Sequence, residues 1–145
     1  MHPAASRALF DEKVGRFPAD LATARGWILH PIQYPIIDCQ FTRGGRTPMR
    51  LRLDFTDWDD TPPSIQLLSA DGAALQSVLQ NPTGVYNGSP HPSTGRPFIC
   101  MAGSREFHIH PSHLNEPWDQ FRGKPGFDIG DILDKLWHAW LKGAG

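Results

Sequence analysis

The sequence has 145 residues, with 14 basic and 15 acidic side chains and a formal net charge of −1 when histidine is neutral. This length fits one domain over residues 1–145, which buries enough apolar surface to fold without disulfides. The balanced charge, with no basic run, argues against a nucleic-acid or anionic-membrane partner. There is no apolar run of bilayer length, the first residues are too polar for a signal peptide, and the chain has only two cysteines. We therefore expect a reduced, cytoplasmic protein.

Hydrophobic spacing predicts two helical segments followed by a sheet. Apolar residues at helical spacing predict a helix over residues 4–17 and a short helical turn over residues 19–25. The period then changes to alternation, which predicts strands over residues 37–41, 49–55 and 64–70. Sequential strands with short connections indicate an antiparallel meander that packs on a helix.

The second half of the chain combines an irregular loop with a long helix. Residues 81–98 are rich in proline and glycine and predict a long loop, a feature that is often functional in a compact domain. Short extended segments are expected at residues 98–101 and 106–110, and an apolar stripe predicts a helix over residues 128–142. The predicted fold class is α+β: an N-terminal helix, an antiparallel meander, a long loop bearing Cys100, and a C-terminal helix.

Titratable residues concentrate between Cys100 and His113. Four of the seven histidines lie between residues 91 and 113. In an extended chain, Glu106, His108 and His110 project from the same face. A thiolate, a carboxylate and imidazoles satisfy the ligand requirement of tetrahedral zinc. The same groups also surround a nucleophilic thiol with side chains that move protons, so residue types alone leave both chemistries open.

Simpler structural interpretations apply to several of these residues. A histidine is more often hydrogen-bonded or solvated than a metal ligand, and Glu-x-His-x-His is also the pattern of a solvated strand face. Cys39 lies within a predicted strand and is expected to be a core residue. Trp137 and Trp140 share helical spacing and are expected in the core as well. Cys100 is the better candidate for chemistry, because an irregular loop precedes it and titratable residues follow it.

The order of these elements resembles the ubiquitin-conjugating E2 fold. That family runs from an N-terminal helix through a four-stranded meander and a Pro-rich turn to a His-Pro-Asn loop, the active-site cysteine and C-terminal helices. Here Pro62-Pro63 separates two predicted strands, His91-Pro92-Ser93 stands where His-Pro-Asn would stand, and Ile99-Cys100-Met101 is similar to the family's Ile-Cys-Leu. The resemblance implies an E2-like fold. Ser93 departs from it, because asparagine supports the isopeptide step in typical E2 enzymes.

The sequence is more similar to a bacterial family described as a predicted metal-binding domain with a Cys-Glu-His-His signature, whose members look like divergent E2 proteins. Cys100, Glu106, His108 and His110 resemble this signature, and His113 is a further candidate for one of its histidines. The family is associated with bacterial ubiquitin-like proteins, an E1-like adenylating enzyme and a JAB-type peptidase, in pathways implicated in phage defence. The resemblance therefore implies an E1-like enzyme, a ubiquitin-like protein and an acceptor protein as partners.

The first functional hypothesis is an E2-like carrier enzyme that requires no cofactor. Cys100 accepts the C-terminal acyl group of a ubiquitin-like protein from an E1 thioester and passes it to an amine. His108 or His110 deprotonates the incoming nucleophile, and Glu106 orients that imidazole. The residues expected to support the loop are His91 and Ser93.

The alternative is a non-enzymatic zinc-binding module. Its expected ligands are Cys100, Glu106, His108, His110 and, as a further candidate, His113. This hypothesis predicts a tightly retained metal and loss of the fold on chelation. The carrier hypothesis accounts for the order of elements along the whole chain, whereas a zinc site accounts only for residues 100 to 113.

Overall fold

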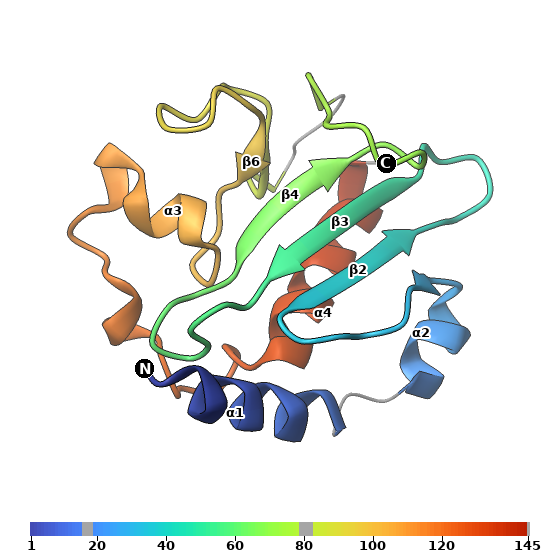
Figure 1. Cartoon of the computed structure of the whole chain (residues 1–145). Helices are drawn as coiled ribbons and strands as arrows, with labels where there is room; N and C mark the ends of the chain where they lie inside the picture. The colour runs from blue at the N-terminus through green and yellow to red at the C-terminus, as the bar shows by residue number, and fades with distance from the viewer. Residues whose placement is uncertain (16–18, 79–82, 145) are drawn as a thin grey trace.

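A four-stranded antiparallel sheet runs through the molecule in the order β1-β2-β3-β4 (Figure 1). The computed structural model describes residues 1–15, 19–78 and 83–144. The strands are β1 (Ile28–Leu29), β2 (Ile36–Phe41), β3 (Met49–Asp54) and β4 (Ser64–Leu68). The three predicted strands are confirmed within two residues at their ends. The short β1, which pairs with β2, was not predicted.

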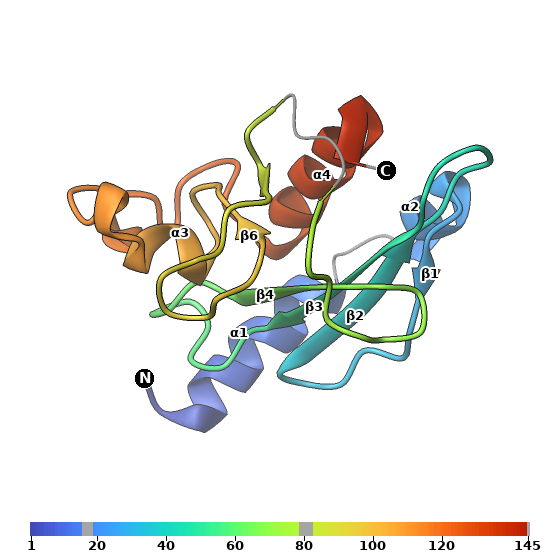
Figure 2. The ribbon, with the colours of Figure 1, turned by 90° about the horizontal axis from the view of Figure 1, so that it is seen from above.

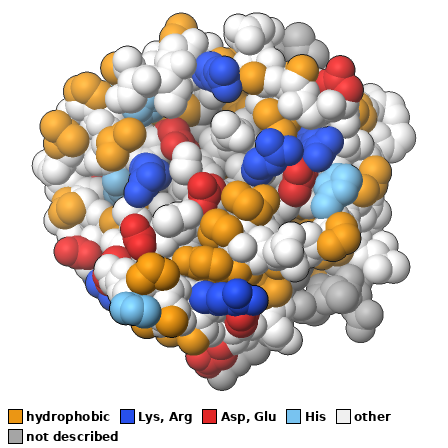
Figure 3. All heavy atoms as spheres, in the orientation of Figure 1, with side chains coloured by type: hydrophobic (Ala, Val, Ile, Leu, Met, Phe, Trp, Pro, Cys, Tyr) orange, Lys and Arg blue, Asp and Glu red, His pale blue; other side chains and the backbone are white. Residues whose placement is uncertain are grey.

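Alternation in β2 and β3 divides the sheet into a buried and a polar face. Cys39 pairs with Leu51 across the two strands, and both side chains are fully buried. On the opposite face, Arg50 donates two hydrogen bonds to the Asp38 carboxylate, at 2.8 and 2.9 Å, and Arg52 donates two more, at 3.2 and 3.4 Å. Figure 3 shows acidic and basic side chains interspersed over the visible surface, without a large area of one charge.

The C-terminal helix α4 (Ile129–Ala139) lies against the buried face of the sheet (Figure 2). Its apolar stripe is buried, and the Trp137 ring meets Phe41 of β2 with ring centroids 5.3 Å apart. A final π-helical turn, η3 (Trp140–Ala144), continues the helix. Gly143 has a φ of 156°, a conformation that favours glycine and ends the helix as predicted.

Two further helices, α1 (Pro3–Gly15) and α2 (Ala19–Arg25), confirm the helical segments predicted at the N-terminus. The expected last turn of the first helix, at residues 16 and 17, lies outside the described residues. The Phe10 ring of α1 is buried against Phe55, with ring centroids 5.6 Å apart, so α1 closes one end of the sheet (Figure 1). Among the described residues, no helix has the length and apolar character needed to cross a membrane.

The segment that carries the titratable residues is more ordered than the sequence predicts. Within the expected loop, β5 (Tyr86–Asn87) pairs with β6 (Phe98–Ile99) in a small two-stranded sheet. The prediction of an extended segment over residues 106–110 is wrong, because the helix α3 (Arg105–Ile109) occupies this position. The buried Ser104 caps α3 by accepting a hydrogen bond from the Phe107 N–H at 3.2 Å. Two short 3₁₀ helices follow, η1 (Pro111–His113) and η2 (Trp118–Gln120).

Candidate functional site

Cys100 lies directly after β6, at the start of the turn that leads to α3. Its backbone N–H donates to the Val85 carbonyl at 2.7 Å, so the cysteine is held beside β5. Strand β5 is in turn fixed to α4, because the buried Tyr86 hydroxyl donates to the Leu136 carbonyl at 2.8 Å. The thiol is partly exposed, unlike the thiol of Cys39, which is buried in the core as predicted. The fold therefore presents one cysteine at the surface from a braced backbone position.

The side chain of His113 contacts this thiol. Its Nε2 lies 3.8 Å from the Cys100 Sγ, and its Nδ1 lies 2.8 Å from the Glu116 Oε2. An ionised carboxylate only accepts hydrogen bonds, so the proton of the neutral ring belongs on Nδ1. The lone pair of Nε2 then faces the sulfur. Cys100, His113 and Glu116 thus have the arrangement of a nucleophile, a base and an orienting group.

Local structure fixes the plane and the position of the His113 ring. The ring stacks on Phe107 of α3, with centroids 3.9 Å apart and an interplanar angle of 18°. The Glu116 N–H donates to the His113 carbonyl at 2.9 Å, which closes a turn and brings the two side chains to the same side. The contact between His113 and Glu116 therefore follows from the turn after η1.

The environment of Cys100 favours the protonated thiol. Burial raises its pKa above the usual range, a hydrogen bond from the Asn87 side chain lowers it, and the Glu116 carboxylate raises it again. The Asn87 Oδ1 accepts from the Ser89 N–H at 2.8 Å, which leaves the amide NH₂ as the group that donates to sulfur. Because the thiol is neutral at neutral pH, nucleophilic attack requires a base to take its proton.

His108, a predicted catalytic base, holds together two backbone segments that follow Cys100, at Gly103 and at Glu116. Its Nε2 accepts from the Gly103 N–H at 3.0 Å, and its Nδ1 donates to the Glu116 carbonyl at 2.7 Å. Burial lowers the pKa of this imidazole, in agreement with a neutral ring that accepts at one nitrogen. Both ring nitrogens are thus used to hold the backbone.

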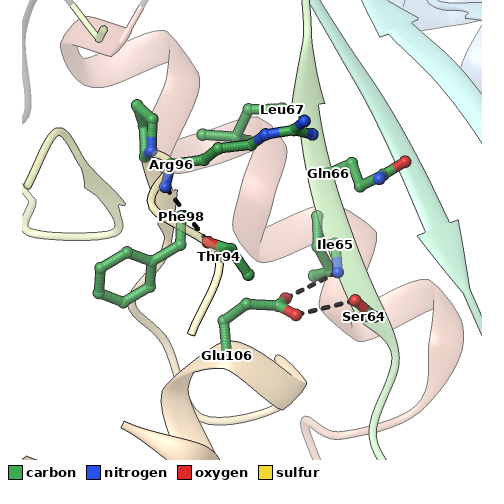
Figure 4. A pocket seen from close by; sticks show the side chains of 9 residues that line it. Ser64, Ile65, Gln66, Leu67, Thr94, Arg96, Phe98 and Glu106 are labelled. Carbon is green, nitrogen blue, oxygen red and sulfur yellow. Dashed lines mark hydrogen bonds between the residues drawn. The ribbon is translucent and has the colours of Figure 1, made fainter. Parts of the chain in front are cut away.

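Glu106, predicted to orient a catalytic imidazole, instead contacts strand β4 (Figure 4). Its carboxylate accepts from the Ser64 hydroxyl and from the Ile65 N–H, both at 2.8 Å. The side chain borders a cavity of about 170 Å³ between β4 and residues 94–98, and Cys100 is not among the residues that line this cavity. Burial raises the pKa of Glu106, while its hydrogen bonds lower it. Glu106 joins α3 to the edge of the sheet.

The remaining candidates lie in the same region with different contacts. The buried His91 donates from Nε2 to the Glu106 carbonyl at 2.8 Å, and its Nδ1 accepts from the Ser93 N–H at 3.0 Å. The Ser93 side chain itself is exposed. The His110 ring stacks on Phe98, and its Nδ1 accepts from the backbone N–H of Ser112 at 3.1 Å.

The donor set proposed for zinc does not converge in this structure. In the described ranges 1–15, 19–78 and 83–144, no three His, Cys, Asp or Glu side chains are grouped so that they could hold a metal ion. Both oxygens of Glu106 and both ring nitrogens of His108 have protein partners. A tetrahedral site on Cys100, Glu106, His108 and His110 would require these contacts to break. In the described part of the chain, the arrangement of these residues therefore does not fit a zinc ion.

Two residues of the site were not singled out by the sequence analysis. Glu116 was missed, although its spacing of three residues after His113 is a signal for two side chains on one turn. Asn87 was missed within the predicted loop over residues 81–98, because its contact with Cys100 depends on the pairing of β5 with β6. His113 was named only as a metal ligand, and the structure places it next to the thiol.

The fold and the site together define an α+β protein with a surface Cys-His-Glu cluster. Residues 76–144, which contain this cluster, match a family model described as Y4jH-like (Y4jH family). Over 41 residues the chain is 46% identical to the uncharacterized protein y4jH of Sinorhizobium fredii (strain NBRC 101917 / NGR234). The match covers 28% of this chain and 20% of y4jH, so the chain spans about a fifth of the length of that relative.

Proposed function

We propose that this protein is an E2-like carrier that accepts a ubiquitin-like protein as a thioester on Cys100 and transfers it to a nucleophile. The observation that carries the proposal is the distance of 3.8 Å between the His113 Nε2 and the Cys100 Sγ. Of the two cysteines, both within the described residues, Cys100 is the one whose thiol is partly exposed. The antiparallel meander, the loop that leads to Cys100 and the helix behind the sheet support the same assignment, since an E2-like chain would have these elements in this order.

Loading of Cys100 is a thioester exchange. The thiol of Cys100 loses its proton to His113 Nε2, and the sulfur attacks the carbonyl carbon of the thioester carried by the E1-like enzyme. The new C–S bond forms to Cys100 as the C–S bond to the E1 cysteine breaks, and the departing thiolate takes up a proton. Transfer reverses these roles: an amine of the acceptor protein attacks, loses a proton and releases the Cys100 thiol.

Asn87 takes the position of a hydrogen-bond donor at the reacting sulfur. Typical E2 enzymes place an asparagine in the loop before the cysteine, where this chain has Ser93 with an exposed side chain. The Asn87 amide donates to Cys100 from the other strand of the small sheet, with its orientation fixed by Ser89. An amide that donates to the sulfur can also donate to the oxyanion that forms when the carbonyl carbon is attacked.

The partners in this proposal are an E1-like adenylating enzyme, a ubiquitin-like protein and an acceptor protein, in a cytoplasmic bacterial conjugation pathway of the kind implicated in phage defence. The resemblance of the sequence to divergent E2 proteins suggests these partners. The balanced charge of the chain and the mixed charge of the face seen in Figure 3 agree with protein partners rather than nucleic acid.

The test is formation of a reducible adduct. The purified chain is mixed with ATP and with the E1-like enzyme and ubiquitin-like protein encoded in the same genome, and the products are separated with and without dithiothreitol. We expect an adduct that disappears on reduction and is absent in Cys100→Ser, while Cys39→Ser retains it. An adduct that resists dithiothreitol, or one that persists in Cys100→Ser, would contradict the proposal.

A further inference from the structure

We infer that Cys100, His113 and Glu116 form a catalytic triad that takes acyl groups from small activated esters and thioesters without an E1-like enzyme and hydrolyses them. The inference rests on the role of Cys100 as nucleophile in the proposed function, and it adds an intrinsic acyl-transfer activity. Its substrate class is short, unbranched acyl donors with a good leaving group.

The first step follows from the proton positions in the cluster. Glu116 holds the proton of the neutral ring on His113 Nδ1, so Nε2 is free to accept the thiol proton. As the proton moves, the ring becomes cationic between a carboxylate on one side and a thiolate on the other, and both neighbours stabilise it. Activation of the sulfur is thus complete within the chain and needs no group from a partner.

Acylation and deacylation balance within the same three residues. The thiolate attacks the carbonyl carbon and the bond to the leaving group breaks. The leaving group either takes the proton from His113 or departs as an anion, in which case His113 releases its proton to solvent. Once neutral again, His113 accepts a proton from water as its oxygen attacks the thioester carbonyl. The C–S bond then breaks, a carboxylic acid is released and the Cys100 thiol is restored.

The surroundings of the cluster admit water and small substrates. The His113 side chain is 25% exposed and the Glu116 side chain 43% exposed, so the thioester and its base both border solvent. The thiol is only partly exposed, and Phe107 stacks on one face of the His113 ring. These contacts favour acyl groups without branches next to the carbonyl.

The experiment uses p-nitrophenyl acetate and the full chain. We expect a burst of p-nitrophenolate equal to the protein concentration, a slower steady release, and an acetyl group located on Cys100 by peptide mass spectrometry. Cys100→Ser abolishes the burst. His113→Gln lowers the acylation rate on the order of 100-fold or more, the usual cost of removing a general base. His138→Gln changes an exposed histidine of α4 that the cluster does not use, and it retains the wild-type rate.

Glu116 is a positioning residue, and its test includes a spectroscopic readout. We expect Glu116→Ala to lower kcat with little change in KM. In ¹⁵N NMR spectra, the ring resonances that disappear in His113→Gln shift in Glu116→Ala from the Nδ1–H tautomer toward a mixture of tautomers. A structural effect alone would not move this tautomer signature in a folded variant.

Several outcomes overturn the inference. They are a wild-type chain that gains no acetyl group on Cys100, a His113→Gln variant that acylates as fast as wild type, and equal losses in His113→Gln and His110→Asn. The two assays separate this inference from the proposed function. An E1-dependent thioester without ester turnover overturns only the triad activity, whereas ester turnover without an E1-dependent thioester overturns only the carrier function.

Discussion

The imidazole of His108 donates to the backbone carbonyl of Glu116, with the Nδ1 and the carbonyl oxygen 2.7 Å apart. The residue that orients His113 is therefore itself held by a second histidine. The same ring accepts from the Gly103 N–H, three residues after Cys100. His108 in this way connects the backbone next to the thiol with the backbone next to the carboxylate.

This brace predicts a dependence of stability on pH. Burial lowers the pKa of His108 in the folded protein below its ordinary value of about 6.5. The stabilisation from the neutral ring is complete above that value, is lost as pH falls toward the lowered folded pKa, and then levels off. We expect His108→Gln to reduce the change in the urea midpoint between pH 7.5 and pH 5, measured by tryptophan fluorescence. An unchanged pH profile in the variant would contradict the role of the neutral ring.

Alkylation should distinguish the two cysteines. Cys39 has no exposed surface, and burial raises its pKa to about 12, whereas Cys100 is partly exposed. We expect iodoacetamide to label one cysteine in the native chain, identified as Cys100 by peptide mapping, and both in urea. Because the pKa of Cys100 is raised, its labelling rate should increase with pH through an inflection above the usual range of about 8.5. An inflection below pH 7 would indicate a preformed thiolate and contradict the general-base description.

Glu106 is predicted to be structural, and two substitutions test this. Glu106→Gln keeps an oxygen for the Ile65 N–H and an amide for the Ser64 hydroxyl, and it removes a carboxyl group whose pKa burial raises. We expect the glutamine variant to unfold within about 1 kcal/mol of wild type at pH 7 and to retain activity. Glu106→Ala leaves a buried N–H without its partner and should lose about 1–3 kcal/mol. Loss of thioester formation in a folded Glu106→Gln variant would contradict the structural role and indicate that Glu106 takes part in catalysis.

Asn87 is predicted to stabilise the oxyanion that forms on the substrate carbonyl, whereas His113 takes the thiol proton. Asn87→Ala removes the donor at the Cys100 sulfur and should slow acyl transfer several-fold, with the fold unchanged by circular dichroism. Asn87→Asp places a carboxylate where negative charge develops and should slow it further. Ser93→Ala provides the matched control in the preceding loop, since the exposed Ser93 side chain has no part in the described site. Equal rates for Asn87→Ala and wild type would contradict the assignment.

Removal of metal is predicted to leave this site unchanged. The possible ligands are held by other partners, so dialysis against a chelator should alter neither the urea midpoint nor the acylation rate of Cys100. Elemental analysis of the untagged wild type beside Cys100→Ser checks this directly. About one zinc per chain in wild type, lost in the variant, would make Cys100 a ligand and favour the binding module.

The sequence was sufficient where local pattern and tertiary packing agree. Alternation in β2 and β3 marks the buried face, because each second residue is buried in the core, and the apolar stripe of α4 is buried in the same core. The error at α3 has a different cause. Glu106, His108 and His110 alternate like a strand, but the Ser104 cap and Pro111 confine a short helix between them. Glu106 and His108 then project from different faces of α3, and His110 lies outside the helix as its C-terminal cap.

The site was predictable as a segment but not as a set of contacts. Cys100 stands out because titratable residues gather after it, and residue types identify that region without the fold. The pairing of His113 with Glu116 depends on one turn, and the contact of Asn87 depends on the register of β5 with β6. Such contacts are set by backbone geometry that spacing along the chain does not encode, so the sequence did not single out His113 as the histidine next to the thiol.

The bond from the Tyr86 hydroxyl to the Leu136 carbonyl has a consequence for transfer. Through β5 and the Val85 carbonyl, it ties the backbone of Cys100 to the helix that forms the core. If the proposed carrier function holds, the sulfur that bears the thioester keeps a nearly fixed position, because within the protein only the Cys100 side chain can rotate. The acceptor amine would then have to reach this sulfur along the surface around it, and the shape of that surface would select which amines react.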